Sequence, residues 1–292
     1  RFLLTFERAM RECDFCVTAD LPLAPATTVA TLRADLDRLR GHVDAVQVSD
    51  SPGGIPHMAP LVAAGLCLDS GIDPVVNLSG RDRNRIALQS ELLGAAALGV
   101  TSLLLTRGDR LPATLSPRAQ KVYEFGAKRL LRCASLIGGE PGLPPVNGFY
   151  LGSAVRVIDP PDGWQPDGIN NKADVGCKFV QTQPVLDVDV LARYLKSLVA
   201  SRVLQRVSVV VSVPVITSQQ GYEALVGSTR GLLLPPRFDP EFGAQDVRER
   251  GIRLAAGTVA SIRSMPGAAA VNLCGADAGA IAAVISHLET RS

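Results

Sequence analysis

The hydrophobic positions of the chain fall into short apolar runs that alternate with longer amphipathic stretches. Eight of the runs have the length and composition of buried β-strands. They are Phe15–Thr18, Val43–Ser49, Pro74–Leu78, Ser102–Thr106, Gly148–Gly152, Lys178–Gln183, Val207–Val213 and Ala268–Leu273. The clearest helical stretches between them are Val29–Arg40, Arg81–Leu98, Lys121–Leu136, Val188–Ser201, Asp246–Ser264 and Ala276–Thr290.

This alternation predicts a particular sheet. Strands that are separated by helices form parallel sheets with helices packed on their faces. Eight such units favour a closed (β/α)8 barrel, the TIM barrel of the α/β class, and a doubly wound open sheet is the alternative. Phe2–Arg11 precedes the first strand and predicts a short N-terminal helix beneath the barrel floor. We expect a single barrel domain over residues 1–292.

Composition supports a globular barrel and argues against two classes of partner. The chain has 292 residues, of which 47% are hydrophobic and 20% charged, so it can bury one sizeable core. The net charge of +2 is scattered, and no basic stripe with interleaved aromatic residues indicates nucleic-acid binding. No apolar run reaches the ~18 residues of a membrane helix, so we expect a cytoplasmic protein that does not bind membranes.

The six cysteines do not indicate a metal site. Cys13 and Cys16 form a lone CxxC pair, and the only histidines are His42, His57 and His287. A structural zinc site needs four ligands, which this set does not offer near the pair. We therefore predict free thiols and no bound metal.

Polar residues gather at the carboxyl ends of the predicted strands, the face on which TIM barrels carry their active sites. They include Asp20, Ser49, Asp50, Asn77, Arg107, Asp109, Gln181, Gln183 and Asn272. Each one alone is typical of a helix cap or a turn. As a set they predict one shared mouth, formed by Asp20, Asn77, Asp109 and Gln183. We interpret Arg81, Arg83 and Arg85 as the solvated start of a helix.

Three motifs occur in order along the chain. They are the run from Asn77 to Val100, the strand Leu103–Asp109 with its Arg-Gly-Asp ending, and the segment Lys172–Gln183 with its Thr-Gln ending. Together they resemble the methylenetetrahydrofolate reductase family, and Val17–Pro22, Asp44–Pro52 and Gly251–Gly275 fit its other strands. The chain resembles a divergent member with a bacterial-type catalytic barrel.

The resemblance implies an activity and its cofactors. In that family FAD lies across the barrel mouth and takes a hydride from NADH or NADPH. The hydride then passes to 5,10-methylenetetrahydrofolate and gives 5-methyltetrahydrofolate, a step of one-carbon metabolism and methionine biosynthesis. The resemblance therefore implies a flavoprotein oxidoreductase with a small-molecule folate substrate, and it leaves a homo-oligomer or a partner subunit open.

The resemblance also implies roles for single residues. The family's general acid falls on Asp20, its pterin-contacting and flavin-tuning aspartate on Asp109, and its pterin-binding glutamine on Gln183. An acid is needed because the imidazolidine ring must open to an iminium before it accepts hydride. The aromatic residue that stacks on folate or nicotinamide falls on Tyr222.

The positions of the family's flavin contacts can be read in the same way. They fall on Ser49, Asn77, Arg107, Asp109, Tyr123 and Lys172. Arg107 and Lys172 would neutralise the pyrophosphate, and Ser49 would donate a hydrogen bond to it. Tyr123 would cover the adenine or the ribose.

Some positions depart from the family pattern. The family usually reads His-Leu-Thr-Cys where this chain has Asn77-Leu-Ser-Gly80, and Asp20 is one methylene shorter than the family's glutamate. These changes leave two alternatives open. One is a divergent paralogue that oxidises methyl-tetrahydrofolate during demethylation. The other is a flavin-free folate-binding subunit.

Overall fold

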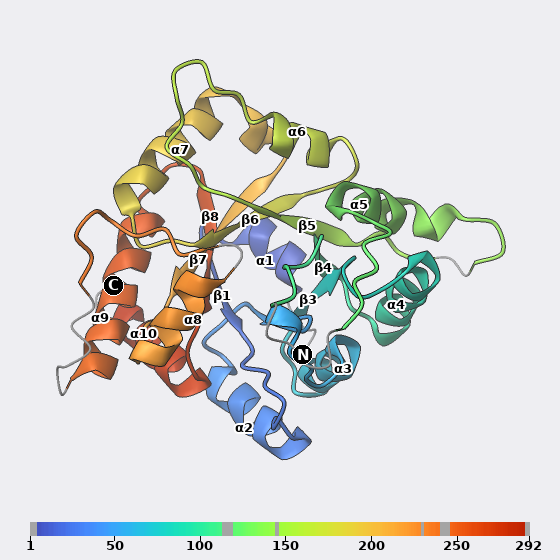
Figure 1. The fold of residues 1–292 in the computed structure, drawn as a ribbon, viewed down its shortest axis with the longest axis horizontal. Helices are drawn as coiled ribbons and strands as arrows, with labels where there is room; N and C mark the ends of the chain where they lie inside the picture. The colour runs from blue at the N-terminus through green and yellow to red at the C-terminus, as the bar shows by residue number, and fades with distance from the viewer. Residues whose placement is uncertain (1–4, 113–118, 144–145, 229–230, 240–245, 290–292) are drawn as a thin grey trace.

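The computed structural model describes residues 5–112, 119–143, 146–228, 231–239 and 246–289. Its parallel strands form a closed barrel in chain order, and the last strand pairs with the first (Figure 1). The strands are β1 (Cys16–Asp20), β2 (Ala45–Val48), β3 (Pro74–Ser79), β4 (Ser102–Thr106), β5 (Tyr150–Val155), β6 (Phe179–Pro184), β7 (Ser208–Pro214) and β8 (Ala268–Cys274). The predicted (β/α)8 barrel is confirmed, and the open doubly wound sheet is excluded.

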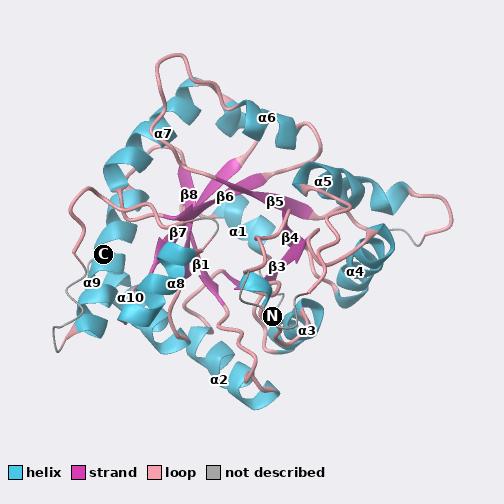
Figure 2. Ribbon diagram, in the orientation of Figure 1, coloured by secondary structure: helices cyan, strands magenta, loops and turns pink. Residues whose placement is uncertain are grey.

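Helices surround the barrel and, at one end, close it (Figure 2). They are α1 (Phe6–Glu12), α2 (Val29–Leu39), α3 (Pro60–Asp69), α4 (Arg85–Leu98), α5 (Ala127–Leu136), α6 (Asp167–Ala173), α7 (Val188–Ala200), α8 (Gln219–Gly227), α9 (Val247–Arg263) and α10 (Ala278–Glu289). Short 3-10 turns are η1 (Pro52–Gly54), η2 (Ile137–Gly139) and η3 (Val203–Gln205). The pattern predicts neither α3, which is apolar around much of its surface, nor the short helices α6 and α8. No helix in the described ranges is long and apolar enough to cross a membrane.

Two helices begin later than predicted. α4 begins at Arg85 because the Asn84 side chain accepts a hydrogen bond from the backbone N–H of Ala87 (3.0 Å) and caps the helix there. α5 begins at Ala127, after a loop in which Tyr123 has a left-handed φ of 47°. The residues ahead of both helices are therefore loops on the mouth side of the barrel.

The amino-terminal end of the barrel interior is apolar. Phe6, on α1, packs edge-to-face against Tyr150 of β5 and Phe179 of β6, with ring centroids 5.8 and 5.4 Å apart. Tyr150 and Phe179 stack on each other at 5.2 Å. The Phe179 ring fills the space that a side chain at position 152 would need, so only glycine fits at this position of β5. These residues form the floor of the barrel.

A buried carboxylate ties α1 to this floor. The backbone N–H of Phe6 donates to Asp73 Oδ2 (2.7 Å), immediately before β3. Asp73 is 1% exposed, and burial raises the pKa of its carboxyl to about 6, while the Phe6 N–H acts in the opposite direction. The short N-terminal helix beneath the barrel floor is confirmed.

Candidate active site

A cavity of about 880 Å³ opens at the carboxyl ends of the strands. All eight strands contribute to its wall, together with the loops that follow β1, β2, β3, β4, β7 and β8 and with helix α8. Its volume lies within the ~300–1,000 Å³ that is typical of small-molecule sites. This is the end of the barrel at which TIM-barrel enzymes carry out their chemistry.

Beneath the cavity the barrel interior changes from apolar to polar within two residues along every strand except β5, where Gly152 follows Tyr150. β2 carries Gln47 and β6 carries Gln181, whose carboxamides exchange hydrogen bonds across the barrel; Gln181 Nε2 lies 3.0 Å from Gln47 Oε1. Gln181 Nε2 also donates to Ser212 Oγ of β7 (3.1 Å), and that hydroxyl donates to the backbone carbonyl of Thr182 (2.9 Å). All four residues are buried. They form a hydrogen-bonded base under the cavity.

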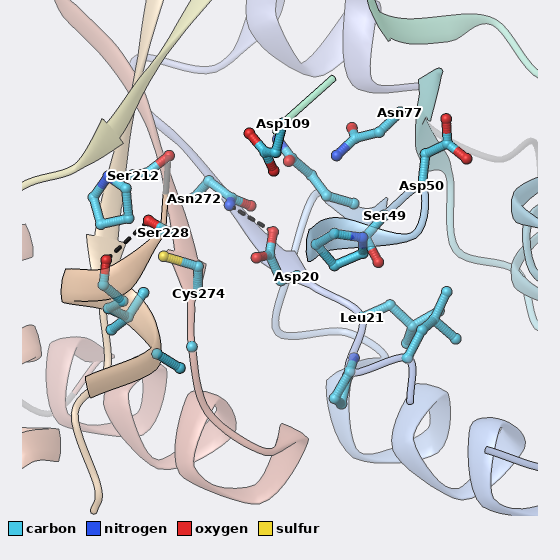
Figure 3. A pocket seen from close by; sticks show the side chains of 18 of the residues that line it. Asp20, Leu21, Ser49, Asp50, Asn77, Asp109, Ser212, Ser228, Asn272 and Cys274 are labelled. Atoms are coloured by element: carbon cyan, nitrogen blue, oxygen red, sulfur yellow. Dashed lines mark hydrogen bonds between the residues drawn. The ribbon is translucent and has the colours of Figure 1, made fainter. Parts of the chain in front are cut away.

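A second network runs from the barrel interior to Asp20. Thr18 Oγ1 of β1 donates to Asn272 Oδ1 of β8 (2.9 Å), and Asn272 Nδ2 donates to Asp20 Oδ1 (2.8 Å; Figure 3). Thr18 is 0% exposed and Asn272 1%, whereas Asp20 is half-buried and lines the cavity. At the junction of β8 and β1, the Asp20 carboxylate therefore lines the cavity and accepts a hydrogen bond from the buried Asn272 amide.

Arg107 and Asp109 line the cavity directly after β4. The Arg107 guanidinium lies over the Tyr123 ring, 4.7 Å from its centroid, and the Tyr123 hydroxyl donates to the backbone carbonyl of Asp109 (2.9 Å). Gly108, between them, has a φ of 89°, and a side chain there would collide with the β3 exit. Tyr123 is not on the cavity wall; it braces the turn that presents the arginine and the aspartate.

The arginines that follow β3 are not all solvated, so the prediction of a solvated helix start is wrong for Arg81 and Arg83. Arg81 is 1% exposed; its Nε and Nη2 bind the Asp82 carboxylate (2.7 and 2.6 Å), and Nη2 donates to Ser51 O (2.8 Å). The hydrogen bonds that Arg81 donates to the Asp82 carboxylate raise the pKa of its guanidinium. Arg83 donates two hydrogen bonds to Asp50 (2.7 and 3.0 Å). These pairs fix the loops after β2 and β3.

Ser49 lies on the cavity wall after β2, beside His57. His57 Nδ1 lies 2.7 Å from the carbonyl of Met58, so Nδ1 carries the proton and Nε2 is an acceptor. Nε2 accepts from the backbone N–H of Ser51 (3.0 Å) and lies 3.3 Å from the Ser49 hydroxyl. The imidazole thus holds the loop that carries Ser49.

Asn77 and Ser79 line the cavity from β3. Asn77 Oδ1 and Ser79 Oγ are buried and have no hydrogen-bond partner within the described residues. A buried polar atom without a partner typically costs ~1–3 kcal/mol. The β3 exit therefore carries polar groups that the described part of the protein does not satisfy, as is expected where a ligand binds.

Gln183 lies off the cavity wall, contrary to the expectation that it shares the mouth with the other three residues. It is 5% exposed; its side chain accepts from the backbone N–H of Val157 (2.8 Å) and donates to the carbonyl of the same residue (3.2 Å). The register of β6 against β7 shifts between Gln181 and Pro184. An irregularity of this kind redirects side chains. Gln181 lines the cavity in this strand, and Gln183 fastens the strand to the loop after β5.

Two further predicted contacts also lie off the wall. Lys172, in the last turn of α6, donates from Nζ to the backbone carbonyl of Ala154. Tyr222, on α8, stacks on Phe238 with ring centroids 6.1 Å apart. The structure thus brings five of the nine predicted site residues together on the wall, namely Asp20, Ser49, Asn77, Arg107 and Asp109.

Thr18, Gln47 and Ser212 belong to the two polar networks and are not among the predicted site residues. Each of them is a polar residue within an apolar strand run. Each follows a floor residue by two positions and therefore faces the barrel interior. Period-two spacing is the signal that identifies them.

The described cysteines are free thiols, and the described residues contain no group of three or more His, Cys, Asp or Glu residues that could hold a metal ion. Burial raises the pKa of the Cys16 and Cys67 thiols to about 12. Both thiols are therefore protonated at neutral pH and poor nucleophiles.

Comparison with known proteins bears on the identity of this site. Residues 22–264 match the family model described as methylenetetrahydrofolate reductase. No curated protein matches the chain. The matched residues run from the loop after β1 to the end of α9 and include the exits of β2, β3 and β4, which form much of the cavity wall. Since the match covers most of the chain, the protein belongs to the methylenetetrahydrofolate reductase family.

Proposed function

We propose that the chain interconverts 5,10-methylenetetrahydrofolate and 5-methyltetrahydrofolate, with NADH or NADPH as hydride source and FAD as carrier. Family membership supports oxidoreductase chemistry on folate one-carbon units. The observation that carries the finer proposal is that Asp20 and Asp109 line one cavity together with Arg107. Carboxylates suit the N–H groups of a pterin, and the arginine suits an anionic group.

Asp20 is the proposed acid. In the reductive direction the bond between N10 and the methylene carbon breaks, N10 receives a proton, and an iminium remains at N5. Asp20 lines the cavity, and the hydrogen bond from Asn272 fixes its carboxylate. In the reverse direction the same carboxylate accepts the proton from N10.

Asp109 is the proposed pterin contact. The pyrimidine edge of a 2-amino-4-oxo pterin carries neighbouring N–H donors, which one carboxylate accepts as a pair. The Tyr123 hydroxyl braces the turn that carries Asp109, so little reorganisation is needed on binding. Gln183 and Tyr222 lie behind the wall, and pterin binding in this arrangement does not depend on them.

The exits of β2, β3 and β4 fit a flavin. Asn77 has a buried Oδ1 without a hydrogen-bond partner within the described residues. Arg107 lines the cavity, and no ion pair with a described residue neutralises its charge. Asn77 would contact the ring, and Ser49 and Arg107 would bind the phosphates. Lys172 is a weaker candidate because its ammonium already donates to Ala154 O. When bound, FAD would supply a two-electron carrier between nicotinamide and folate.

Turnover in both directions tests the proposal. Purified protein, with and without added FAD, is assayed for methylene-tetrahydrofolate reduction by NADH and NADPH, and for methyl-tetrahydrofolate oxidation with an artificial electron acceptor. We expect folate turnover in at least one direction and flavin absorbance in the loaded protein. A folded protein that binds folate but turns it over under none of these conditions would contradict the proposal and favour a binding subunit.

A further inference from the structure

Asn272 lies between a buried donor and the cavity. Thr18 Oγ1 is 2.9 Å from Asn272 Oδ1 and 3.3 Å from the backbone carbonyl of Val271. Because the Thr18 hydroxyl donates to Oδ1 of Asn272, the amide nitrogen Nδ2 is the atom that faces Asp20. The hydrogen bond from Thr18 therefore orients the amide, and the amide donates to Oδ1 of the Asp20 carboxylate.

A donated N–H has a definite effect on a carboxyl group. It stabilises the ionised form relative to the protonated form, because the carboxylate is the stronger acceptor. Asn272 is 1% exposed, so water does not compete for its N–H. The hydrogen bond to Asp20 is therefore expected to favour the carboxylate.

The other ionisable groups on the cavity wall come from the exits of β2, β3, β4 and β8. They are Asp50 after β2, Arg81 after β3, Arg107 and Asp109 after β4, Cys274 at the end of β8 and Asp277 before α10. Three of them are in ion pairs: Asp50 with Arg83, Arg81 with Asp82, and Asp277 with Arg248. The charges of these three groups are matched locally, and the Asn272 amide donates directly to the Asp20 carboxylate (2.8 Å).

We propose that Asn272 is a positioning residue that orients Asp20 and favours its ionised form, so that the resting site is set to accept a proton. The inference rests on the proposed function, because it concerns the acid–base group of that reaction. Both residues lie outside the matched range 22–264, so the family match does not assign this pair.

The proposal has a consequence for the direction of the reaction. When 5-methyltetrahydrofolate is oxidised, a hydride leaves the N5 methyl group for an oxidised nicotinamide or flavin, and an iminium forms. The N10 lone pair then bonds to the iminium carbon, the C=N π electrons return to N5, and the N10 proton moves to Asp20. This direction needs an ionised Asp20. At neutral pH the resting site therefore suits methyl oxidation.

Titration of Asp20 tests the proposal without requiring turnover. Protein labelled with ¹³C at the aspartate carboxyl groups is titrated by NMR, and the Asp20 signal is the one that Asp20→Asn removes. Asn272→Leu deletes the donor at nearly constant volume and should raise the titration midpoint by about one to two pH units, the equivalent of one charge-assisted hydrogen bond. Thr18→Val should raise it less, because the amide keeps its N–H but loses its fixed orientation.

The remaining variants separate this effect from general damage. The double variant should shift the midpoint no further than Asn272→Leu alone, since both changes act through one hydrogen bond. Ser212→Ala removes a buried hydroxyl from the other polar network and should leave the midpoint unchanged. Should Asn272→Leu fail to fold, Thr18→Val carries the test.

The outcomes distinguish the inference from the proposed function. An unchanged Asp20 midpoint in folded Asn272→Leu would overturn the inference even where the wild type turns folate over. A shifted midpoint would support it even where turnover is absent. In an active enzyme, Asn272→Leu should move the acid limb of the kcat profile for methyl oxidation to higher pH by the same amount, with KM nearly constant. If the role of Asn272 were purely structural, the substitution would change KM or stability and leave the acid limb in place.

Discussion

The floor and the mouth of the barrel are built on the same strands, and they differ in what those strands carry. At the floor, Phe6, Tyr150 and Phe179 pack ring against ring with no ligand space. Two residues further along, Gln181 begins a polar layer, and beyond it the cavity opens. Strand geometry brings every second residue inward, so one strand can serve both ends. The comparison shows close aromatic packing at one end of the barrel and a polar cavity at the other, which is the end where TIM barrels carry their active sites.

The largest expected effect is at the mouth. Asp20→Asn removes the proposed acid while keeping the shape of the side chain, and general acid–base catalysis typically contributes ~10²–10⁴-fold. We expect folate turnover to fall within that range, while reduction by nicotinamide of the loaded enzyme changes little. Stopped-flow measurement of the two half-reactions checks this. Equal losses in both halves would assign Asp20 to binding or structure.

The floor should respond in the opposite way. Phe6→Ala leaves a cavity among the buried rings, and a substitution of this kind costs ~3–5 kcal/mol of unfolding free energy. The variant should lose stability in denaturant titrations and, while folded, retain its folate turnover. Asp20→Asn should keep wild-type stability within ~1 kcal/mol. A Phe6→Ala variant that unfolds at the wild-type midpoint would break the division between floor and mouth.

The stability of the protein should also depend on pH through Asp73, the buried carboxyl group at the floor. Burial raises the pKa of Asp73 from 3.8 to about 6, so the folded state binds this proton more tightly than the unfolded state. The contribution of this proton to the free energy of unfolding is complete below about pH 4 and falls as the pH rises toward 6. Above pH 6 it is lost, and the total change is on the order of 2–3 kcal/mol. Asp73→Asn should flatten this part of the stability profile. A wild-type profile that rises between pH 4 and 6, with the same slope in the variant, would contradict the assignment.

The smallest expected effect is a difference in FAD affinity between variants of Arg107 and Lys172, two cationic residues near the mouth. Arg107 lines the cavity, whereas Lys172 donates to the carbonyl of Ala154. Arg107→Ala should weaken FAD binding by the ~1.5–3 kcal/mol of a charge-assisted contact, and Lys172→Ala should weaken it less. Fluorescence titration with FAD measures both. A larger loss in Lys172→Ala would mean that the phosphates lie on the β5–α6 side.

Local pattern predicted the fold well because each buried strand is a short apolar run with its own signal. β4 has the predicted bounds, and β8 differs from its predicted bounds only by including Cys274. Asp20 and Asp109 were also predicted, because each stands at or just after the end of a strand and such residues meet at the mouth.

The errors arise where contacts beyond the strand pattern decide the outcome. Gln183 follows the strand pattern, but the irregularity in β6 turns it to Val157. Arg81 reads as a surface charge, yet its ion pair with Asp82 lets it be buried. Asp20 and Asn272 are both expected at the strand ends, but their hydrogen bond spans 252 positions of sequence and only closure of the barrel pairs them.

A crystal structure with bound 5-methyltetrahydrofolate tests the central claim most directly, because the claim is that the mouth holds the folate and carries the chemistry. The account predicts a pterin in the cavity, with its pyrimidine edge within hydrogen-bond distance of Asp109 and N10 within reach of the Asp20 carboxylate. Folate bound outside this cavity, or bound in it with N10 turned away from Asp20, would contradict the account.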